Sequence, residues 1–423
     1  MKKLSSYLLI TLIVFLIFEN LNTVTAFAYT LEDDPQIIAD KAITIDLDTK
    51  EIIYAKNADI KAQPASTTKL MTALLFSLYK DQNDMLTFTE NATSEPSSSV
   101  YKDFSLKLSP GDLILADTVM KGLMLHSGND MASVIAENIS GDIDSFSNLM
   151  NEKAKEFNMT NTLFSTPSGL DTDEALNGKE HYTTAYDLSI LGSYALNDPW
   201  VLNTASIDNI ILDINENTSI NLVNGNKNLN NNGCLGGKTG FTTKAGRCLV
   251  ALYERDGRKI LGVIMGSTYP DYFNDMEKII DYSYNVKPTT IYESGDILTT
   301  ESTPFKLFKL FGPEINYDIP LIINEDIYQY SNDINDKETE ISLNTNINTW
   351  NLSENSIIGT VTIKERDSSK TFNLYTNITT EDLIKENIKF YIACIFIIVV
   401  TIMLLIIIIR NILRKKNKFL TRV

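Results

Sequence analysis

The segment PASTTKLMTALL, residues 64–75, places Ser66 three positions before Lys69 at the start of an apolar run. Residues at this spacing lie on one face of a helix, within contact distance. A lysine can act as a neutral base when burial or a nearby positive charge lowers its pKa. A serine in a first helical turn also lies beside free backbone N–H groups, which can stabilise an oxyanion. Ser66 and Lys69 are therefore candidates for a nucleophile and its base.

The S-x-x-K spacing does not identify a site by itself. The same pattern recurs at Ser77 with Lys80 and at Ser99 with Lys102. A second interpretation also fits residues 64–75 equally well, in which Ser66 is an ordinary helix N-cap. The choice between these interpretations depends on what else the chain carries.

Two downstream elements favour the catalytic interpretation. The stretch HSGND places Ser127 and Asn129 in an expected turn between two helices, and GGKTGFT places Lys238, Thr239 and Gly240 on an expected strand. Glycines on a strand allow a substrate backbone to approach closely. The order S-x-x-K, S-x-N, K-T-G is the motif set of penicillin-binding proteins and class A β-lactamases.

Other chemistries have little support in the sequence. The chain has only two histidines, His126 and His181, and neither an HExxH motif nor Cys/His zinc spacing, so no metal site is expected. It has no G-x-S-x-G motif, and both histidines are expected to be structural. The formal charge of −17 argues against a nucleic-acid partner, because phosphate binding needs clustered Lys and Arg.

The motif stretches resemble the low-molecular-mass penicillin-binding proteins, which are serine D-alanyl-D-alanine carboxypeptidases related to class A β-lactamases. The resemblance covers about 35–286 and includes TPSGLDTDE and HYTTAYDLSILG. It implies that Ser66 attacks the carbonyl between the two terminal D-alanines of a peptidoglycan stem peptide. It also implies that Lys69 takes the serine proton, Ser127 relays a proton to the leaving D-alanine, and Asn129 orients the substrate and Lys69.

The resemblance also implies a substrate-binding strand. Lys238 is expected to bind the terminal carboxylate and to keep Lys69 neutral, and Thr239 to hydrogen-bond that carboxylate. Gly240 allows close approach, and the backbone N–H groups of Ser66 and Phe241 are expected to form the oxyanion hole. No cofactor is expected, and β-lactam antibiotics are expected to acylate Ser66 as substrate mimics.

One departure from the family concerns this carboxylate. Many relatives place an arginine after the K-T-G sheet, but residues 266–285 contain none. Carboxylate recognition is therefore expected to depend on Lys238 and Thr239, or on an arginine elsewhere such as Arg247.

Two alternatives remain open at this point. A class A β-lactamase needs a carboxylate in an E-x-x-L-N loop, whereas this chain has DEALN at 173–177, with the shorter Asp173 in place of Glu. A surface insertion explains that loop more simply. The other alternative is a non-catalytic cell-wall-binding or morphogenetic protein on the same fold, for which loss of a motif residue would be expected.

The elements that must position these residues follow from periodicity. A β-hairpin is expected within 35–62, turning at Asp48-Thr49, and a helix over 64–80. Further helices are expected at 113–126, 130–139, 146–158, 183–196 and 271–285. Strands are expected at 234–242 and 246–267, the second with a turn at Asp256-Gly257. The predicted fold is an α/β (α+β) β-lactamase/transpeptidase-like domain with an antiparallel sheet flanked by helices, over 29–286.

A small all-β domain is expected at 289–385, where short alternating runs rich in Thr, Ile and Asn follow Pro288. The partners of this β domain are not predicted by the sequence. Cys234 and Cys248 flank a predicted hairpin without facing one another, so no disulfide is expected.

Both ends of the chain carry membrane signals. Residues 1–28 have the basic start, apolar core and small-residue cleavage site of a signal peptide. Residues 390–409 carry no charge, which predicts a transmembrane helix at 390–410, and the tail at 411–423 is basic. Because positive residues stay in the cytoplasm, we expect a single-pass protein of the cell membrane with its catalytic domain outside.

Overall fold

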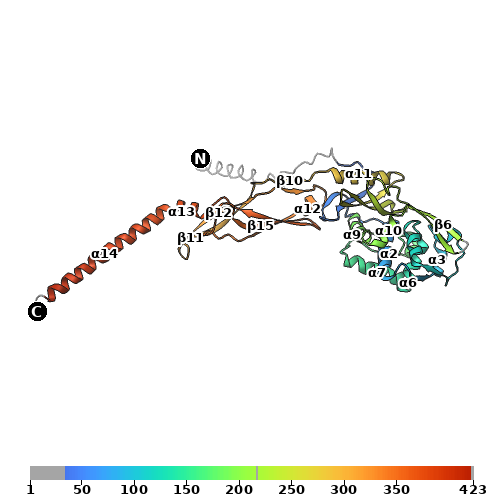
Figure 1. Ribbon diagram of the computed structural model, residues 1–423, viewed down its shortest axis with the longest axis horizontal. Coiled ribbons are helices and arrows are strands. Elements are labelled where there is room, and N and C mark those ends of the chain that lie inside the picture. The colour runs from blue at the N-terminus through green and yellow to red at the C-terminus, as the bar shows by residue number, and fades with distance from the viewer. Residues whose placement is uncertain (1–33, 216–217, 421–423) are drawn as a thin grey trace, which may run out of the picture. The chain divides into compact units, whose positions relative to one another are not determined.

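The computed structural model describes residues 34–215 and 218–420, so the expected signal peptide at 1–28 lies outside the described residues. The described chain contains two five-stranded antiparallel sheets, each with its own hydrophobic core (Figure 1). The prediction of a mixed α/β domain, a following β domain and an apolar C-terminal helix is confirmed. The expected boundaries of the two domains, 29–286 and 289–385, remain predictions.

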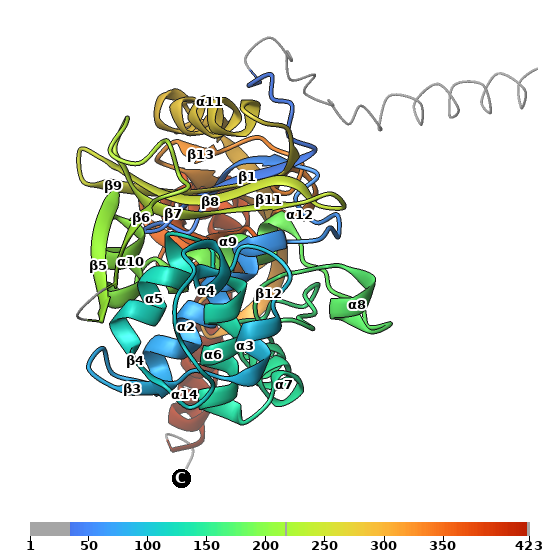
Figure 2. The same cartoon turned by 90° about the vertical axis from the view of Figure 1, so that its right-hand side faces the viewer.

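The first sheet has the order β2-β1-β9-β8-β7, which makes β7 an edge strand. Its strands are β1 (Lys41–Asp46), β2 (Ile52–Lys56), β7 (Cys234–Thr242), β8 (Gly246–Arg255) and β9 (Arg258–Ser267). The helix α11 (Asp271–Asn285) covers one face, and α9 (Ala185–Ala195) packs on the other (Figure 2). Both faces are therefore buried, which explains the long apolar runs of β8 and β9.

The helical layer surrounds one central helix, α2 (Lys69–Tyr79), whose first eight residues are all buried. Around it lie α5 (Ala116–Met124), α6 (Asn129–Ser140), α7 (Ile143–Glu156) and α10 (Pro199–Ala205). A helix that is apolar on all sides needs such a surround. Because α2 begins at Lys69, this packing places the lysine side chain in the interior.

Two of the expected helices begin at other residues in the structure than the sequence predicted. The expected helix at 113–126 is a strand, β4 (Leu113–Leu115), followed by α5. Leu113 and Leu115 are exposed and Ile114 is buried, so this start alternates as a strand does, and β4 pairs with β3 (Met85–Thr87). The helix expected at 146–158 begins at Ile143, because the Asp142 carboxylate caps it by accepting from the Ser145 N–H.

Some elements were not predicted at all. They are the short helices α3 (Glu90–Ser94), α4 (Val100–Asp103) and α8 (Asp173–Leu176), the helix α10, and a hairpin of β5 (Asn209–Asn215) and β6 (Thr218–Val223). The two cysteines are free, as expected: Cys234 pairs in register with Tyr253, and Cys248 pairs with Gly240.

The second sheet has the order β11-β12-β16-β15-β14. Its strands are β11 (Ile297–Phe308), β12 (Phe311–Ile323), β14 (Glu340–Thr345), β15 (Ile357–Lys364) and β16 (Ser369–Tyr375). A second pair joins β10 (Thr289–Tyr292) to β13 (Ile327–Gln329), and two short helices, α12 (Asn335–Glu338) and α13 (Thr380–Glu386), complete this region. The long helix α14 (Ile388–Leu420) follows, and its part from Ile388 to Arg414 is long and apolar enough to cross a membrane.

Candidate active site

The three motifs meet at the start of the buried helix. Ser66 lies in a 3-10 turn, η2 (Ala65–Thr68), and Lys69 is the first residue of α2. Asn129 is the first residue of α6, and Ser127 lies in the turn between α5 and α6. Lys238 lies on β7, next to η2 in space. The interpretation of Ser66 as a helix N-cap is wrong, because the cap residue is Pro64 for η2 and Thr68 for α2, and neither makes a side-chain cap bond.

The side-chain nitrogen of Lys69 is within hydrogen-bond distance of three groups. Its Nζ lies 3.0 Å from the Ser66 Oγ, 2.7 Å from the Asn129 Oδ1 and 2.8 Å from the Ser168 carbonyl oxygen. The Asn129 amide is oriented by its Nδ2, which donates to the Ser97 carbonyl at 2.9 Å, so its oxygen faces the lysine. The Asn129 Oδ1 and the Ser168 carbonyl oxygen can only accept hydrogen bonds, so Lys69 must donate to both.

The pKa of Lys69 is lowered well below its usual range, first by complete burial and then by the positive charge of Lys238. A neutral amine has two N–H groups and one lone pair. The two acceptors, Asn129 Oδ1 and Ser168 O, take both hydrogens, which leaves the lone pair for the hydroxyl hydrogen of Ser66. The geometry therefore suits Lys69 as the base that deprotonates Ser66.

The second lysine, Lys238, is coupled to Ser127. Its Nζ donates to the Ser127 Oγ at 3.0 Å and to the Thr239 carbonyl at 3.1 Å. Burial lowers the pKa of Lys238 to about 7. Ser127 has φ of 62°, in the left-handed region, which a serine adopts at a cost. That turn brings the S-x-N and K-T-G motifs into hydrogen-bond contact.

Backbone packing fixes the nucleophile against the edge strand. Ala65, just before Ser66, has φ of 50°, another left-handed residue. A Cβ on Gly240 would lie 3.0 Å from the Ser66 nitrogen, closer than ordinary van der Waals contact, so the glycine favours this close approach of β7. A Cβ on Gly169, whose φ is +81°, would overlap the Ala65 carbonyl oxygen. Two glycines therefore permit the approach of separate segments to the turn that carries Ser66.

The outer end of β7 carries an aromatic cluster. Phe241 is half exposed, and Arg247 lies opposite it in the strand ladder with its guanidinium carbon 4.2 Å from the Phe241 ring centroid. The same guanidinium lies 5.2 Å from the Tyr269 ring and 5.7 Å from the Tyr272 ring. Arg247 is thus held beside β7 by cation–π contacts.

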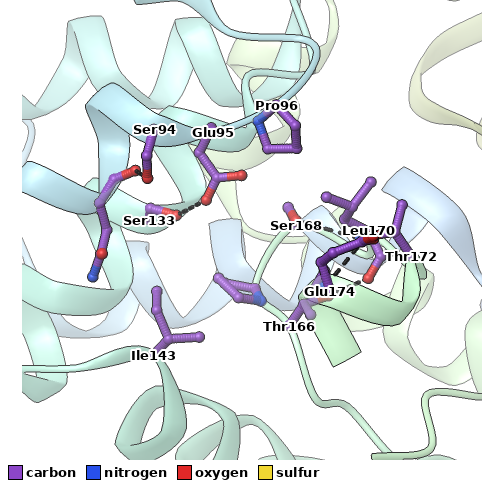
Figure 3. Close-up of a pocket in the computed structure, with 13 residues that line it drawn as sticks. Ser94, Glu95, Pro96, Ser133, Ile143, Thr166, Ser168, Leu170, Thr172 and Glu174 are labelled. Carbon is purple, nitrogen blue, oxygen red and sulfur yellow. Dashed lines mark hydrogen bonds between the residues drawn. The ribbon is translucent and has the colours of Figure 1, made fainter. Parts of the chain in front are cut away.

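A cavity of about 330 Å3 lies next to Ser168, whose carbonyl accepts from Lys69. Figure 3 shows Glu95 and Ser133 on one side of it and Ser168, Thr172 and Glu174 on the other. Glu95 accepts a 2.5 Å hydrogen bond from the Ser133 hydroxyl. Its negative charge raises the pKa of Lys69, against the larger effects of burial and Lys238.

Sequence reasoning missed several of these residues. Ser168 and Ser97 act through backbone carbonyls, which leave no trace in residue type, and Glu95 belongs to none of the three motifs. Asp130 directly follows the S-x-N motif and is buried, where it accepts from the Ser99 hydroxyl and the Tyr101 N–H. An acid in the first turn of a helix was the available signal for it.

The competing S-x-x-K copies have ordinary structural roles. The Ser77 hydroxyl donates to Asp198 at 2.8 Å, and Ser99 caps α4 by accepting from the Lys102 N–H. His126 bonds to Asp103 at 2.8 Å. His126 therefore has a local structural partner.

The His181 ring is buried, and its pKa is lowered to about 4 by that burial. Its Nδ1 accepts from the Ser165 N–H at 3.0 Å, so Nε2 carries the hydrogen toward the Thr68 hydroxyl 3.2 Å away. Asp173 is a surface residue that pairs with Lys244 at 3.0 Å. The position that a β-lactamase would use to activate water is thus on the surface.

Comparison with known proteins gives consistent matches. The family model described as Peptidase_S11, D-alanyl-D-alanine carboxypeptidase, matches residues 28–268. The D-alanyl-D-alanine carboxypeptidase DacF of Bacillus subtilis is 30% identical over 335 residues, which is 77% of this chain and 82% of that protein. DacA of Escherichia coli is 32% identical over 268 residues, covering 59% of this chain and 62% of its own.

Solved structures agree with the fold. Penicillin-binding protein D2 from Listeria monocytogenes, in its ampicillin-bound form, is 27% identical with a TM-score of 0.53, covering 60% of this chain and 100% of that one. The carboxypeptidase DacD from Francisella tularensis is 21% identical with a TM-score of 0.59, covering 85% of this chain and 98% of that one. The second match shows a shared fold that extends beyond the first domain.

Proposed function

This chain belongs to the S11 family of serine D-alanyl-D-alanine carboxypeptidases, and from that premise we propose that Ser66 is its nucleophile and Lys69 its base. The observation that carries the assignment is the environment of Lys69. A buried, neutral amine with both hydrogens committed to carbonyl-type acceptors, Asn129 Oδ1 and Ser168 O, has its lone pair free for the Ser66 hydroxyl 3.0 Å away.

In acylation, the Ser66 Oγ attacks the carbonyl carbon of the penultimate D-alanine while Lys69 Nζ takes the hydroxyl proton. The carbonyl oxygen becomes an oxyanion, which the backbone N–H groups of Ser66 and Phe241 would stabilise. The close approach of Gly240 to the Ser66 nitrogen supports this placement, because it brings β7 beside that N–H group.

The intermediate then expels the terminal D-alanine. Its nitrogen needs a proton, which the Ser127 hydroxyl relays: Ser127 gives its hydrogen to the leaving nitrogen and regains one from the Lys69 ammonium, which returns Lys69 to its neutral form. Lys238 Nζ donates to the Ser127 hydroxyl at 3.0 Å. The C–N bond breaks, and an ester of Ser66 remains. Water then attacks the ester carbon and loses a proton to Lys69. Lys69 passes that proton to the Ser66 Oγ as the ester C–O bond breaks, which releases the shortened stem peptide and restores the serine and the neutral lysine. A β-lactam follows the same first step, with its ring amide as the bond that breaks.

Substrate selection is assigned to the terminal carboxylate. The ammonium of Lys238 supplies the positive charge, and the Thr239 hydroxyl supplies a hydrogen bond. Arg247 is the nearest arginine to follow β7 in the chain, and its placement over Phe241 makes it the candidate for the family's missing arginine. No protein partner is assigned to the β domain.

We further assign the membrane attachment to α14, an apolar helix long enough to span a bilayer. In this assignment the basic tail at 411–423 is cytoplasmic, and the catalytic domain faces the cell wall outside. This orientation brings Ser66 to the compartment that contains peptidoglycan stem peptides.

The direct test is mass spectrometry of the full-length protein after reaction with penicillin, with release of D-alanine from a D-Ala-D-Ala peptide measured in parallel. The penicilloyl mass is expected on the peptide containing Ser66, and Ser66→Ala is expected to abolish both reactions. Ser77→Ala and Ser99→Ala are the matched controls, because each serine has the same S-x-x-K spacing and a structural partner instead. Labelling that persists in Ser66→Ala would overturn the assignment.

A further inference from the structure

The hairpin of β11 and β12 ends in an exposed tip, residues 309–311, which carries Lys309 followed by two apolar side chains. Leu310 is 86% exposed and Phe311 is 69% exposed, the two largest values among the hydrophobic residues of the β domain. The Phe311 ring stacks on Phe308 with centroids 5.3 Å apart, so the tip is held by an aromatic contact. Two adjacent apolar side chains at the end of a hairpin indicate an interaction surface.

This tip lies beside the start of α14. Phe308 has its ring centroid 6.1 Å from that of Phe390 and 5.8 Å from that of Tyr391. The Tyr391 hydroxyl donates to the Leu307 carbonyl at 2.6 Å. The hairpin is thus fixed against the first turn of the apolar helix, at the end of the β domain where α14 begins (Figure 1).

The depth of the tip follows from these contacts. The uncharged run of α14 begins at Phe390, and aromatic residues at the ends of a span lie at the headgroup level. Phe308 contacts Phe390, so it lies at that level too. Leu310 lies in the turn that joins β11 to β12, two residues beyond Phe308 and therefore at most about 7 Å away along the chain. An interfacial element typically enters about 5–10 Å into the headgroup and acyl boundary.

We propose that the tip at residues 309–311 inserts its two apolar side chains, Leu310 and Phe311, into the outer interface of the lipid bilayer beside α14, as a second membrane contact of the chain. The partner is the bilayer itself, because the tip is continuous with the aromatic residues that begin the membrane-spanning helix. The inference rests on the proposed span. A second contact would restrict rotation of the β domain about the axis of α14, and would limit the orientations that the domain can take at the membrane.

The test is spin labelling of the full-length protein reconstituted in liposomes, with collision of the label against oxygen and against a water-soluble nickel chelate. Single cysteines replace Leu310 at the tip, Ile341 in the same domain and Ile397 in α14, in a Cys394→Ala background. Cys234 and Cys248 are buried and are left unchanged. Ile341 is the matched control, because it is 44% exposed and lies near Glu338, which is bonded through Arg366 to the first domain.

The ratio of oxygen to nickel accessibility is expected to be several-fold higher at Leu310 than at Ile341, and highest at Ile397. Equal ratios at Leu310 and Ile341, with a lipid-exposed Ile397, would overturn the tip contact and leave the span intact. An aqueous label at Ile397 would overturn the span and the tip together. Shielding of Leu310 from both reagents would indicate a protein contact and would also overturn the proposal.

Discussion

Two lysines share the active site, and burial is the first cause of the lowered pKa of both. They have opposite requirements. In the proposed mechanism, Lys69 must be neutral to accept the Ser66 proton, whereas Lys238 must be charged to bind a carboxylate. The charge of Lys238 also lowers the pKa of Lys69, so the two requirements support each other at a pH below the pKa of Lys238.

This coupling predicts a pH-dependent substrate affinity. The pKa of Lys238 is about 7, so its charge in the free enzyme is lost as the pH rises through 7, and KM for a D-Ala-D-Ala peptide is expected to rise there. Lys238→Arg keeps its charge throughout this range and is expected to show a flat KM, at a higher level because the guanidinium is larger. The measurement is KM from about pH 6 to 9. A rise in Lys238→Arg as steep as in the wild type would contradict this.

Glu95 gives a second prediction, because its charge acts on the pKa of Lys69 in the opposite direction to that of Lys238. Its carboxylate raises the pKa of Lys69, so Glu95→Gln is expected to lower that pKa further. The acid limb of the acylation rate against pH should therefore move to lower pH. Glu137→Gln is the matched control, because Glu137 lies one turn beyond Ser133 on α6 and is not among the charges acting on Lys69. An equal shift in both variants, or none in Glu95→Gln, would rule out a specific effect of Glu95.

At the scale of elements, the site depends on segments that approach one another without side chains. Gly169 follows Ser168 and meets the Ala65 carbonyl, and its φ is +81°. Gly178 has nearly the same φ, +79°, but nothing lies within 4 Å of a Cβ placed there. Substituting alanine at Gly178 therefore tests the free-energy cost of a left-handed backbone alone, whereas the same substitution at Gly169 adds the cost of a steric collision with Ala65.

Gly178→Ala is expected to cost about 1 kcal/mol of unfolding free energy, because only the backbone preference is lost. Gly169→Ala should cost about 3 kcal/mol or more, and should also slow acylation, since the collision moves Ser168 or Ala65. Denaturant unfolding and the rate of penicillin acylation measure the two effects. Equal losses in the two variants would show that the contact with Ala65 has no importance.

The sequence predicted the elements with strong periodicity and the residues with distinctive types. Examples are the helix expected over 64–80, which the structure forms as η2 followed by α2, the strand with the K-T-G motif, and the helix α11. It failed for β4, because three residues are too few to separate strand from helix by period. It also could not indicate Ser168, whose contribution is a backbone carbonyl, or Ala65, whose positive φ is imposed by tertiary packing.

At the scale of the whole molecule, contacts between the two sheet-containing domains hold the β domain against the first sheet. Arg366, before β16, bonds to Asp59 at 2.6 Å and 3.0 Å and to Glu338 at 2.7 Å, and its guanidinium carbon lies 4.5 Å from the Tyr186 ring centroid. The Tyr186 hydroxyl donates to Asp367 at 2.7 Å.

The edge strand β2 is also engaged at this junction. The amides of Asn332 and Asn335 both donate to the Ile52 carbonyl at 2.9 Å. Lys370 forms an ion pair with Glu51. An edge strand offers unpaired backbone groups, and the β domain satisfies one of them here. The junction is thus a set of directional polar contacts, which resist rotation better than an apolar interface of equal area would.

Arg366 is the residue on which this junction most depends, since its side chain is only 17% exposed and joins a carboxylate from each domain. Arg366→Ala is expected to lower the unfolding free energy by about 1–3 kcal/mol, because both carboxylates lose their partner at a partly exposed site. It should also separate one calorimetric transition into two, as the domains no longer unfold together. Penicillin acylation of Ser66 should be unchanged, because Arg366 is outside the catalytic network.

Lys385→Ala, which removes an exposed pair with Glu381 within α13, is the matched control and should alter neither the unfolding free energy nor the number of calorimetric transitions. A single, unshifted transition in Arg366→Ala would mean that the domains are coupled by other contacts.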